Sequence, residues 1–141
     1  MFQRKIILFI LILAYPLLLI AQDEAAPLIE RMQKVSGTEK IDLMNEISVV
    51  YRKTDRLKAL DFARQANELS AKSNYLQGKA LALKNEGVCW FFIGNADSAM
   101  LCYSQALLYF LKLGIKKECR HVTITLDWLL KRPENMMKQS L

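Results

Sequence analysis

The sequence predicts an all-α protein in which antiparallel helix pairs stack side by side as a short solenoid, after an N-terminal signal peptide. Three observations support this class. Apolar residues recur at helical spacing throughout the chain beyond residue 21. Short turn signals rich in Gly, Asn, Ser and Asp separate these segments. A similar pattern of alanines and larger apolar residues occurs twice, forty residues apart, which is typical of stacked repeats. No run alternates regularly enough to predict a strand.

Residues 1–21 have the features of a secretory signal peptide. Arg4 and Lys5 form a basic start, residues 6–20 are an apolar run, and the small residue Ala21 follows. The run is short for a membrane-spanning helix, which needs about 20 apolar residues. We therefore expect export to the periplasm or beyond the cell. A bulky Leu19 before the expected cleavage point leaves an alternative, an uncleaved anchor in the inner membrane.

The first half of the remaining chain contains three predicted helices. Residues 22–37 form a short opening helix and a link, with Pro27 in the first helical turn, where a missing N–H costs little. The next helix covers about 38–53, and Ser36 and Glu39 before it have the spacing of a capping box. A third helix covers about 56–72, with Thr54 and Asp55 at its start as a turn and cap.

Three further helices follow. Ser73 and Asn74 are expected to cap a helix over about 75–93, and Gly94 and Asn95 separate it from another over about 96–113. Gly114 ends that helix, and a last one covers about 115–131 before Pro133 stops it. Residues 132–141 form a basic tail.

Small residues recur where two of these helices should meet. Ala59 and Ala66 match Ala99 and Ala106 at the forty-residue spacing. Helices approach closely only where one of them offers small side chains, so these alanines should be buried against large rings of the neighbouring helix.

The pattern resembles the tetratricopeptide repeat, a pair of antiparallel helices that stacks into a superhelix. The better copy, residues 80–113, has the family's order of apolar, glycine, aromatic, alanine, aromatic and alanine residues, namely Leu83, Gly87, Trp90, Ala99, Tyr103 and Ala106. A weaker copy starts at Lys40. The period is forty rather than about 34 residues. The resemblance implies a first repeat over 38–74, a second over 75–114, and a lone first helix of a third over 115–131.

The resemblance also implies a function. The leader, the opening helix and the helix that leads to Tyr51, Arg52 and Lys53 resemble the exported N-terminal repeat region of bacterial sensor and signalling proteins. Repeat arrays of this family bind peptides or helices on the concave face formed by the first helix of each pair. The residues implied there are Met44, Ser48, Tyr51, Arg52, Lys84, Val88, Phe91, Phe92, Ile124 and Trp128. Family members that grip a carboxylate use Lys and Asn, whereas His121 and Thr125 are among the residues at those positions here, so that clamp is expected to be absent.

Enzyme chemistry is not expected, and neither is a cofactor. His121 is the single histidine, so no paired-histidine metal motif can form. The sequence has no glycine-rich phosphate loop and no serine elbow. Three cysteines fit no zinc or redox spacing, and buried free thiols are expected, with a disulfide between Cys89 and Cys102 as the alternative.

The net positive charge lies at the C-terminal end, where residues 112–141 hold seven Lys and Arg against three Asp and Glu. We favour a solvated helix face over contact with an acidic membrane, and export argues against nucleic acid as a partner. The last helix lacks a second helix to cover Ile124, Trp128 and Leu129, so self-association through residues 115–130 is a further hypothesis. The sequence thus predicts a non-enzymatic scaffold for a protein or peptide outside the cytoplasm. The alternative is a membrane-anchored helical adaptor whose basic tail contacts lipid.

Overall fold

The computed structural model describes residues 23–131, and every regular element in that range is an α-helix. The helices are α2 (Ala26–Lys34), α3 (Gly37–Tyr51), α4 (Arg56–Lys72), α5 (Leu76–Ile93), α6 (Ala96–Leu113) and α7 (Lys116–Leu130). The all-α class is therefore confirmed. The predicted signal peptide over 1–21 and basic tail over 132–141 lie outside the described residues.

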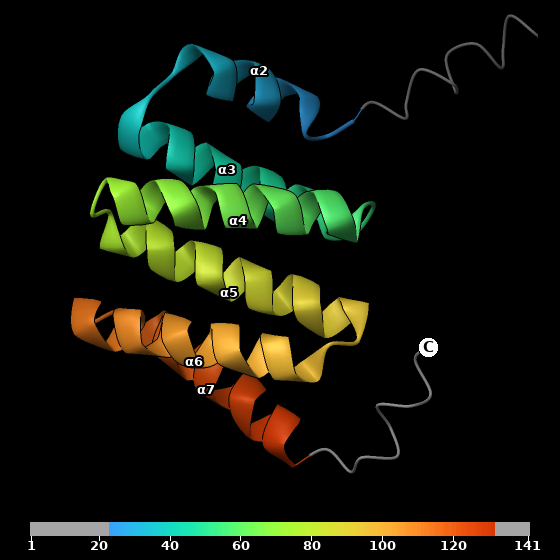
Figure 1. Cartoon of the computed structure of the whole chain (residues 1–141), viewed down its shortest axis with the longest axis vertical. Coiled ribbons are helices and arrows are strands. Elements are labelled where there is room, and N and C mark those ends of the chain that lie inside the picture. The colour runs from blue at the N-terminus through green and yellow to red at the C-terminus, as the bar shows by residue number, and fades with distance from the viewer. Residues whose placement is uncertain (1–22, 132–141) are drawn as a thin grey trace, which may run out of the picture.

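The helices are arranged in space in the order of the chain (Figure 1). Each helix from α2 to α7 packs against the next, and α3 also touches α5. This extra contact brings together two helices that are separated in sequence by all of α4. The surface that they share is the place where a binding site can form between successive helix pairs.

The turn signals act at the predicted helix ends in most places. Asp55 accepts a hydrogen bond from the Lys58 backbone N–H at 3.0 Å and so caps α4. Asn95 accepts one from the Ser98 backbone N–H at 3.0 Å and caps α6. Gly94 (φ 93°) and Gly114 (φ 71°) adopt the left-handed conformation that ends α5 and α6.

Two predicted caps are wrong. Ser36 precedes α3 but makes no side-chain capping bond, so the capping box with Glu39 does not form. Glu39 instead pairs with Arg31 of α2 at 2.7 Å. The residue before α5 is Tyr75, and the Ser73 hydroxyl donates back to the Leu69 carbonyl at 2.8 Å. Ser73 therefore hydrogen-bonds a backbone carbonyl at the end of α4 and does not cap the start of α5.

The repeated alanines are all fully buried, as predicted. Ala59, Ala66, Ala99 and Ala106 each have 0% exposure. Gly87 of α5 faces the ring of Tyr103 of α6, and a Cβ at Gly87 would lie 3.0 Å from Tyr103 Cδ1. Close approach of α5 and α6 at this point therefore depends on the absence of a side chain at residue 87.

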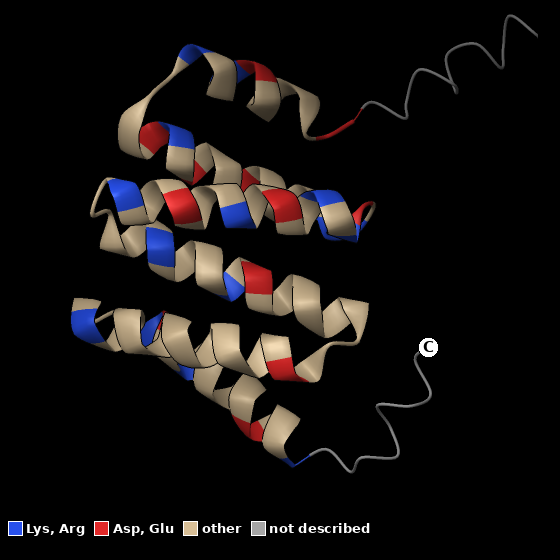
Figure 2. Ribbon diagram, viewed as in Figure 1, with Lys and Arg blue, Asp and Glu red and all other residues tan. Residues whose placement is uncertain are grey.

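Charged side chains of both signs are interspersed along α3, α4 and α5, whereas α6 shows a long stretch without charge (Figure 2). Exposed leucines on α6, among them Leu101 and Leu108, belong to this stretch. Within residues 23–131, no helix combines the length and the apolar character that crossing a bilayer would require.

Candidate functional site

The surface between α3 and α5 is hollowed, and we call this hollow the α3–α5 groove. One part, of about 360 Å³, lies between Asp42, Asn45 and Glu46 of α3 and Leu81, Lys84 and Asn85 of α5, among other residues. The other part, of about 640 Å³, lies where the C-terminal end of α3 meets the start of α4 and the end of α5, and it is lined by Glu24, Val49, Val50, Arg52, Lys53, Arg56 and Phe92. Val49 lines both parts, so the two hollows meet at this residue.

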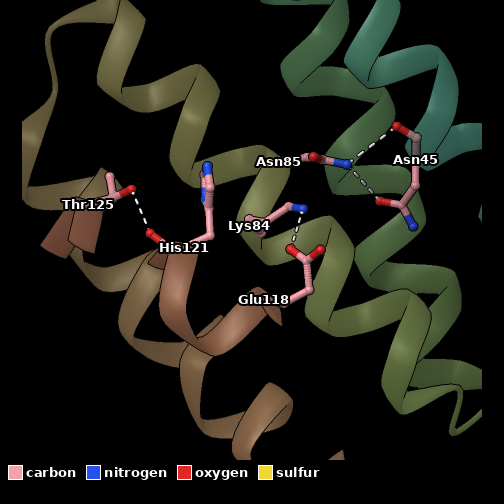
Figure 3. A network of polar contacts seen from close by, with 6 residues as sticks. All are labelled: Asn45, Lys84, Asn85, Glu118, His121 and Thr125. Atoms are coloured by element: carbon pink, nitrogen blue, oxygen red, sulfur yellow. Dashed lines mark hydrogen bonds and ion pairs between the residues drawn. The ribbon is translucent and has the colours of Figure 1, made fainter. Parts of the chain in front are cut away.

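Two buried amides connect the helices beneath the first part of the groove (Figure 3). Asn85 Nδ2 donates to the Asn45 backbone carbonyl at 3.3 Å and to Asn45 Oδ1 at 3.1 Å. Asn45 Nδ2 in turn donates to the Gly78 carbonyl at 3.2 Å. Because buried polar groups are costly unless they are hydrogen-bonded, this pair holds α3 and α5 in one register.

One hydrogen-bond acceptor of this asparagine pair has no partner among the described residues. Asn85 is 2% exposed, and its Oδ1 has no hydrogen-bond partner within the described residues. Figure 3 shows this oxygen pointing away from Asn45. Since Asn85 also lines the groove, this residue combines a buried amide oxygen without a partner with a position at the first part of the groove.

A semi-buried ion pair ties the groove to α7. Lys84 Nζ lies 2.8 Å from Glu118 Oε2, and the two side chains are 19% and 24% exposed (Figure 3). The hydrogen bond from Lys84 lowers the pKa of the Glu118 carboxyl. The charge of Lys84 is thus matched within the protein, although its side chain lines the groove.

The remaining charges of the first part are acidic. Asp42 is half-buried and accepts a hydrogen bond from Tyr75 Oη at 3.1 Å. Burial, and then the bond to Asp42, raises the pKa of the Tyr75 hydroxyl, so this hydroxyl stays protonated as a donor. Glu46 is exposed one turn further along the helix. This part of the groove therefore presents two carboxylates.

The second part is basic and partly aromatic. The Arg56 guanidinium lies 5.5 Å from the centroid of the Phe92 ring, and its Nη1 donates to the Phe92 carbonyl at 3.4 Å. Phe92 is 50% exposed and Val49 41% exposed. Among the residues that the structure describes, no carboxylate forms an ion pair with Arg52, Lys53 or Arg56. Three cations and two exposed apolar side chains thus share this part.

The predicted binding residues fall into three groups. Arg52, Lys84 and Phe92 line the groove. By contrast, the structure buries Met44, Ser48, Tyr51 and Val88.

The buried group serves the packing. Ser48 Oγ donates to the Ala59 carbonyl at 2.8 Å, which ties α3 to α4. Tyr51 Oη donates to Asp23 Oδ2 at 2.7 Å, and this bond lowers the pKa of Asp23 and raises that of Tyr51. Because these four predicted residues are buried, a partner would contact exposed residues beside them instead.

The third group lies on or next to α7. Ile124 and Trp128 are 63% and 46% exposed. Half-buried Phe91 links this helix to the groove, because its ring centroid lies 5.4 Å from those of Trp128 and Phe92. Trp128 therefore lies next to Phe91 at the edge of the groove, and neither Trp128 nor Ile124 is among the residues that line it.

Sequence reasoning missed the polar residues of the groove. Asp42, Asn45, Glu46 and Asn85 were not among the predicted positions, and neither was Arg56. One signal could have found two of them: Asn45 and Asn85 are forty residues apart, the same spacing as the alanines. Two asparagines at equivalent places in successive repeats indicate a contact between the first helices of those repeats.

The described residues offer little for covalent or metal chemistry. His121 is exposed, and its backbone carbonyl accepts a hydrogen bond from Thr125 Oγ1 at 3.0 Å. Within residues 23–131, no group of three His, Cys, Asp or Glu side chains could hold a metal ion. Cys89 and Cys102 are free and buried, and burial raises the pKa of each thiol to about 11.

Comparison of the chain with protein-family models, with curated proteins and with solved structures found no match.

Proposed function

We propose that the protein is a non-enzymatic scaffold that binds a segment of a protein or peptide in the α3–α5 groove. The observation that carries this proposal is the groove itself, an open hollow along α3 and α5 that contains a buried acceptor, Asn85 Oδ1, without a partner among residues 23–131. Small-molecule sites are usually enclosed and mostly apolar. An open, elongated and charged groove fits a polypeptide better.

We further propose that the helices form a short solenoid of the tetratricopeptide kind. Support comes from three facts: the helices pack in chain order, the alanines at the forty-residue spacing are buried, and Asn45 contacts Asn85 at the same spacing. In such an array the first helices of successive pairs share a surface, and α3 and α5 do so here.

The location that we propose is outside the cytoplasm, where the chain would serve as the sensory front end of a larger signalling protein. Its support is the basic, apolar and small-residue order of residues 1–21. Mass spectrometry of the protein recovered from its native host tests this directly. A mature start near Gln22 or Asp23 supports export, whereas an intact Met1 would favour the membrane-anchored adaptor.

Panning a displayed library of random peptides on the full chain tests the binding role. We expect enriched peptides whose binding is lost in Val49→Arg, because a long charged side chain would fill the junction of the two hollows. Leu108→Arg is the matched control, since Leu108 is an exposed apolar residue on α6, outside the residues that line the groove. Failure to enrich any peptide, or equal loss of binding in both variants, would contradict the proposal.

A further inference from the structure

We infer that the ligand of the α3–α5 groove is an extended protein segment with a basic side chain at one end, an acidic side chain at the other and an apolar side chain between them. This inference rests on the proposed binding function and adds the chemistry of the partner. It follows from the way in which the groove separates its charges.

The end formed by the middle of α3 and α5 is negative. Asp42 and Glu46 line it, and the charge of Lys84 is matched by Glu118 at 2.8 Å. Tyr75 donates a hydrogen bond to Asp42 but contributes no positive charge. Two carboxylates are therefore left to attract a lysine or arginine side chain of a ligand.

The other end is positive. Arg52, Lys53 and Arg56 line it together with one carboxylate, Glu24. The Arg56 guanidinium lies over the Phe92 ring, which fixes a cation beside an exposed apolar surface. An aspartate or glutamate side chain of the ligand would be attracted to this end.

The distance between the ends sets the length of the segment. Glu46 and Arg52 are six positions apart along α3, and Asp42 and Arg52 ten, which correspond to about 9 and 15 Å along a helix axis. An extended chain advances about 3.3 Å per residue, so the two charged residues of the ligand should lie three to five positions apart in its sequence. Val49, exposed at the junction of the hollows, lies between them and would contact the central apolar side chain.

The separated charges also select the class of partner. An anionic membrane or a nucleic acid presents one sign of charge, so it would be attracted to Arg52 and Lys53 but repelled by Asp42 and Glu46. A polypeptide can present both signs within a few residues. We therefore assign the groove to a segment of another protein.

Fluorescence anisotropy of the full chain with short labelled peptides tests the inference. The probes have blocked termini and the sequences Lys-Ala-Leu-Ala-Glu and Glu-Ala-Leu-Ala-Lys, because the direction of the ligand is open. The controls carry two Lys, two Glu or two Gln at the ends. We expect one mixed-charge probe to bind about tenfold more tightly than the Gln control at low salt, with the advantage reduced at high salt. Equal binding of the mixed, single-sign and neutral probes would overturn the inference, as would no binding of any probe at millimolar concentration.

Variants of the protein with reversed charges at either end of the groove test the charge preference more specifically. In Glu46→Lys, the mixed probe should lose about threefold in affinity and the two-Glu probe should gain, because the negative end has become positive. In Lys53→Glu, the affinity of the two-Lys probe should increase instead, because the positive end has become less positive. Asp97→Lys and Lys112→Glu reverse exposed charges on α6, outside the residues that line the groove, and should change no affinity.

The chain's own C-terminal segment contains both signs of charge, at Glu134 and Lys138, and the experiment must distinguish it from a partner. A chain that ends at residue 131, with helicity checked by circular dichroism, should bind the mixed probe as the full chain does. Tighter binding by the shortened chain would mean that residues 132–141 compete for the groove, and would overturn the assignment to another protein. If panned peptides bind in a Val49-dependent way but show no charge preference, the inference fails while the binding function stands.

Discussion

The replacement Gly87→Ala examines the close contact between α5 and α6. A Cβ at residue 87 would lie 3.0, 3.1 and 3.2 Å from three atoms of the Tyr103 ring, whereas carbon atoms in contact normally lie about 3.5–4.0 Å apart. The ring would have to retreat by about 0.5 Å to restore that separation. Tyr103 is 3% exposed and belongs to a core cluster that also contains Phe110 and Val122, so there is little space for this movement.

Two effects decide the sign of the change in stability. Alanine is favoured over glycine within a helix by about 1 kcal/mol. Overpacking of a tight core costs about 1–3 kcal/mol. Because the Tyr103 ring is enclosed, we expect the second effect to prevail and the free energy of unfolding to fall by about 1 kcal/mol. For a domain of about 100 residues, Tm would fall by about 4–8 °C.

Thermal and urea unfolding followed by circular dichroism measure this change. Ser104→Ala, at an exposed position of α6, controls for helix propensity and should not destabilise the protein. In a Tyr103→Leu background the clash is removed, so Gly87→Ala should become stabilising by about 1 kcal/mol. Equal stabilisation of the wild-type chain and of the Tyr103→Leu chain by Gly87→Ala would show that the Tyr103 ring does not oppose a Cβ at this position.

Two further predictions concern buried groups near this contact. Burial raises the pKa of the Glu86 carboxyl, although Asn67 donates a hydrogen bond to it at 2.8 Å. The folded protein therefore holds this proton more tightly than the unfolded chain, and its stabilising effect is lost as the pH rises from about 4.5 through the folded pKa. Glu86→Gln should consequently stabilise the protein more at pH 8 than at pH 4 in urea unfolding, and an equal effect at both pH values would contradict this reading. Burial also raises the thiol pKa of Cys89 and Cys102 to about 11, so a thiol reagent at pH 8 should label half-buried Cys119 first. Labelling of all three at one rate, measured by mass spectrometry without denaturant, would show that the core opens readily.

The positions of the helices could be predicted from the sequence because their determinants are local. The helix bounds of α4 (Arg56–Lys72) and α6 (Ala96–Leu113) agree with the expected ones, since Asp55 and Asn95 cap their first turns. The burial of the alanines followed from their spacing along one helical face. The expected capping box at Ser36 does not form because Glu39 pairs with Arg31 of another helix. A tertiary contact of this kind cannot be predicted from the local sequence.

The groove was harder to predict because it depends on which face each helix turns to its neighbour. An error of one residue in the assumed face exchanges Met44, which is buried, for Asn45, which lines the groove. On α5 the prediction named Lys84 but not its neighbour Asn85, although both line the groove. A forty-residue period reveals that two positions are equivalent, but the helix faces that meet become visible only when α3 and α5 are placed together.

The most direct test of the central proposal is chemical-shift mapping of the ¹⁵N-labelled full chain during titration with the mixed-charge peptide that binds more tightly. We expect the largest changes at the backbone amides of Glu46, Val49 and Arg52 in and after α3 and of Lys84 and Asn85 in α5, together with the side-chain amide of Asn85. Changes confined to α6, or to Ile124 and Trp128 of α7, would place the ligand outside the α3–α5 groove and contradict the proposed binding site.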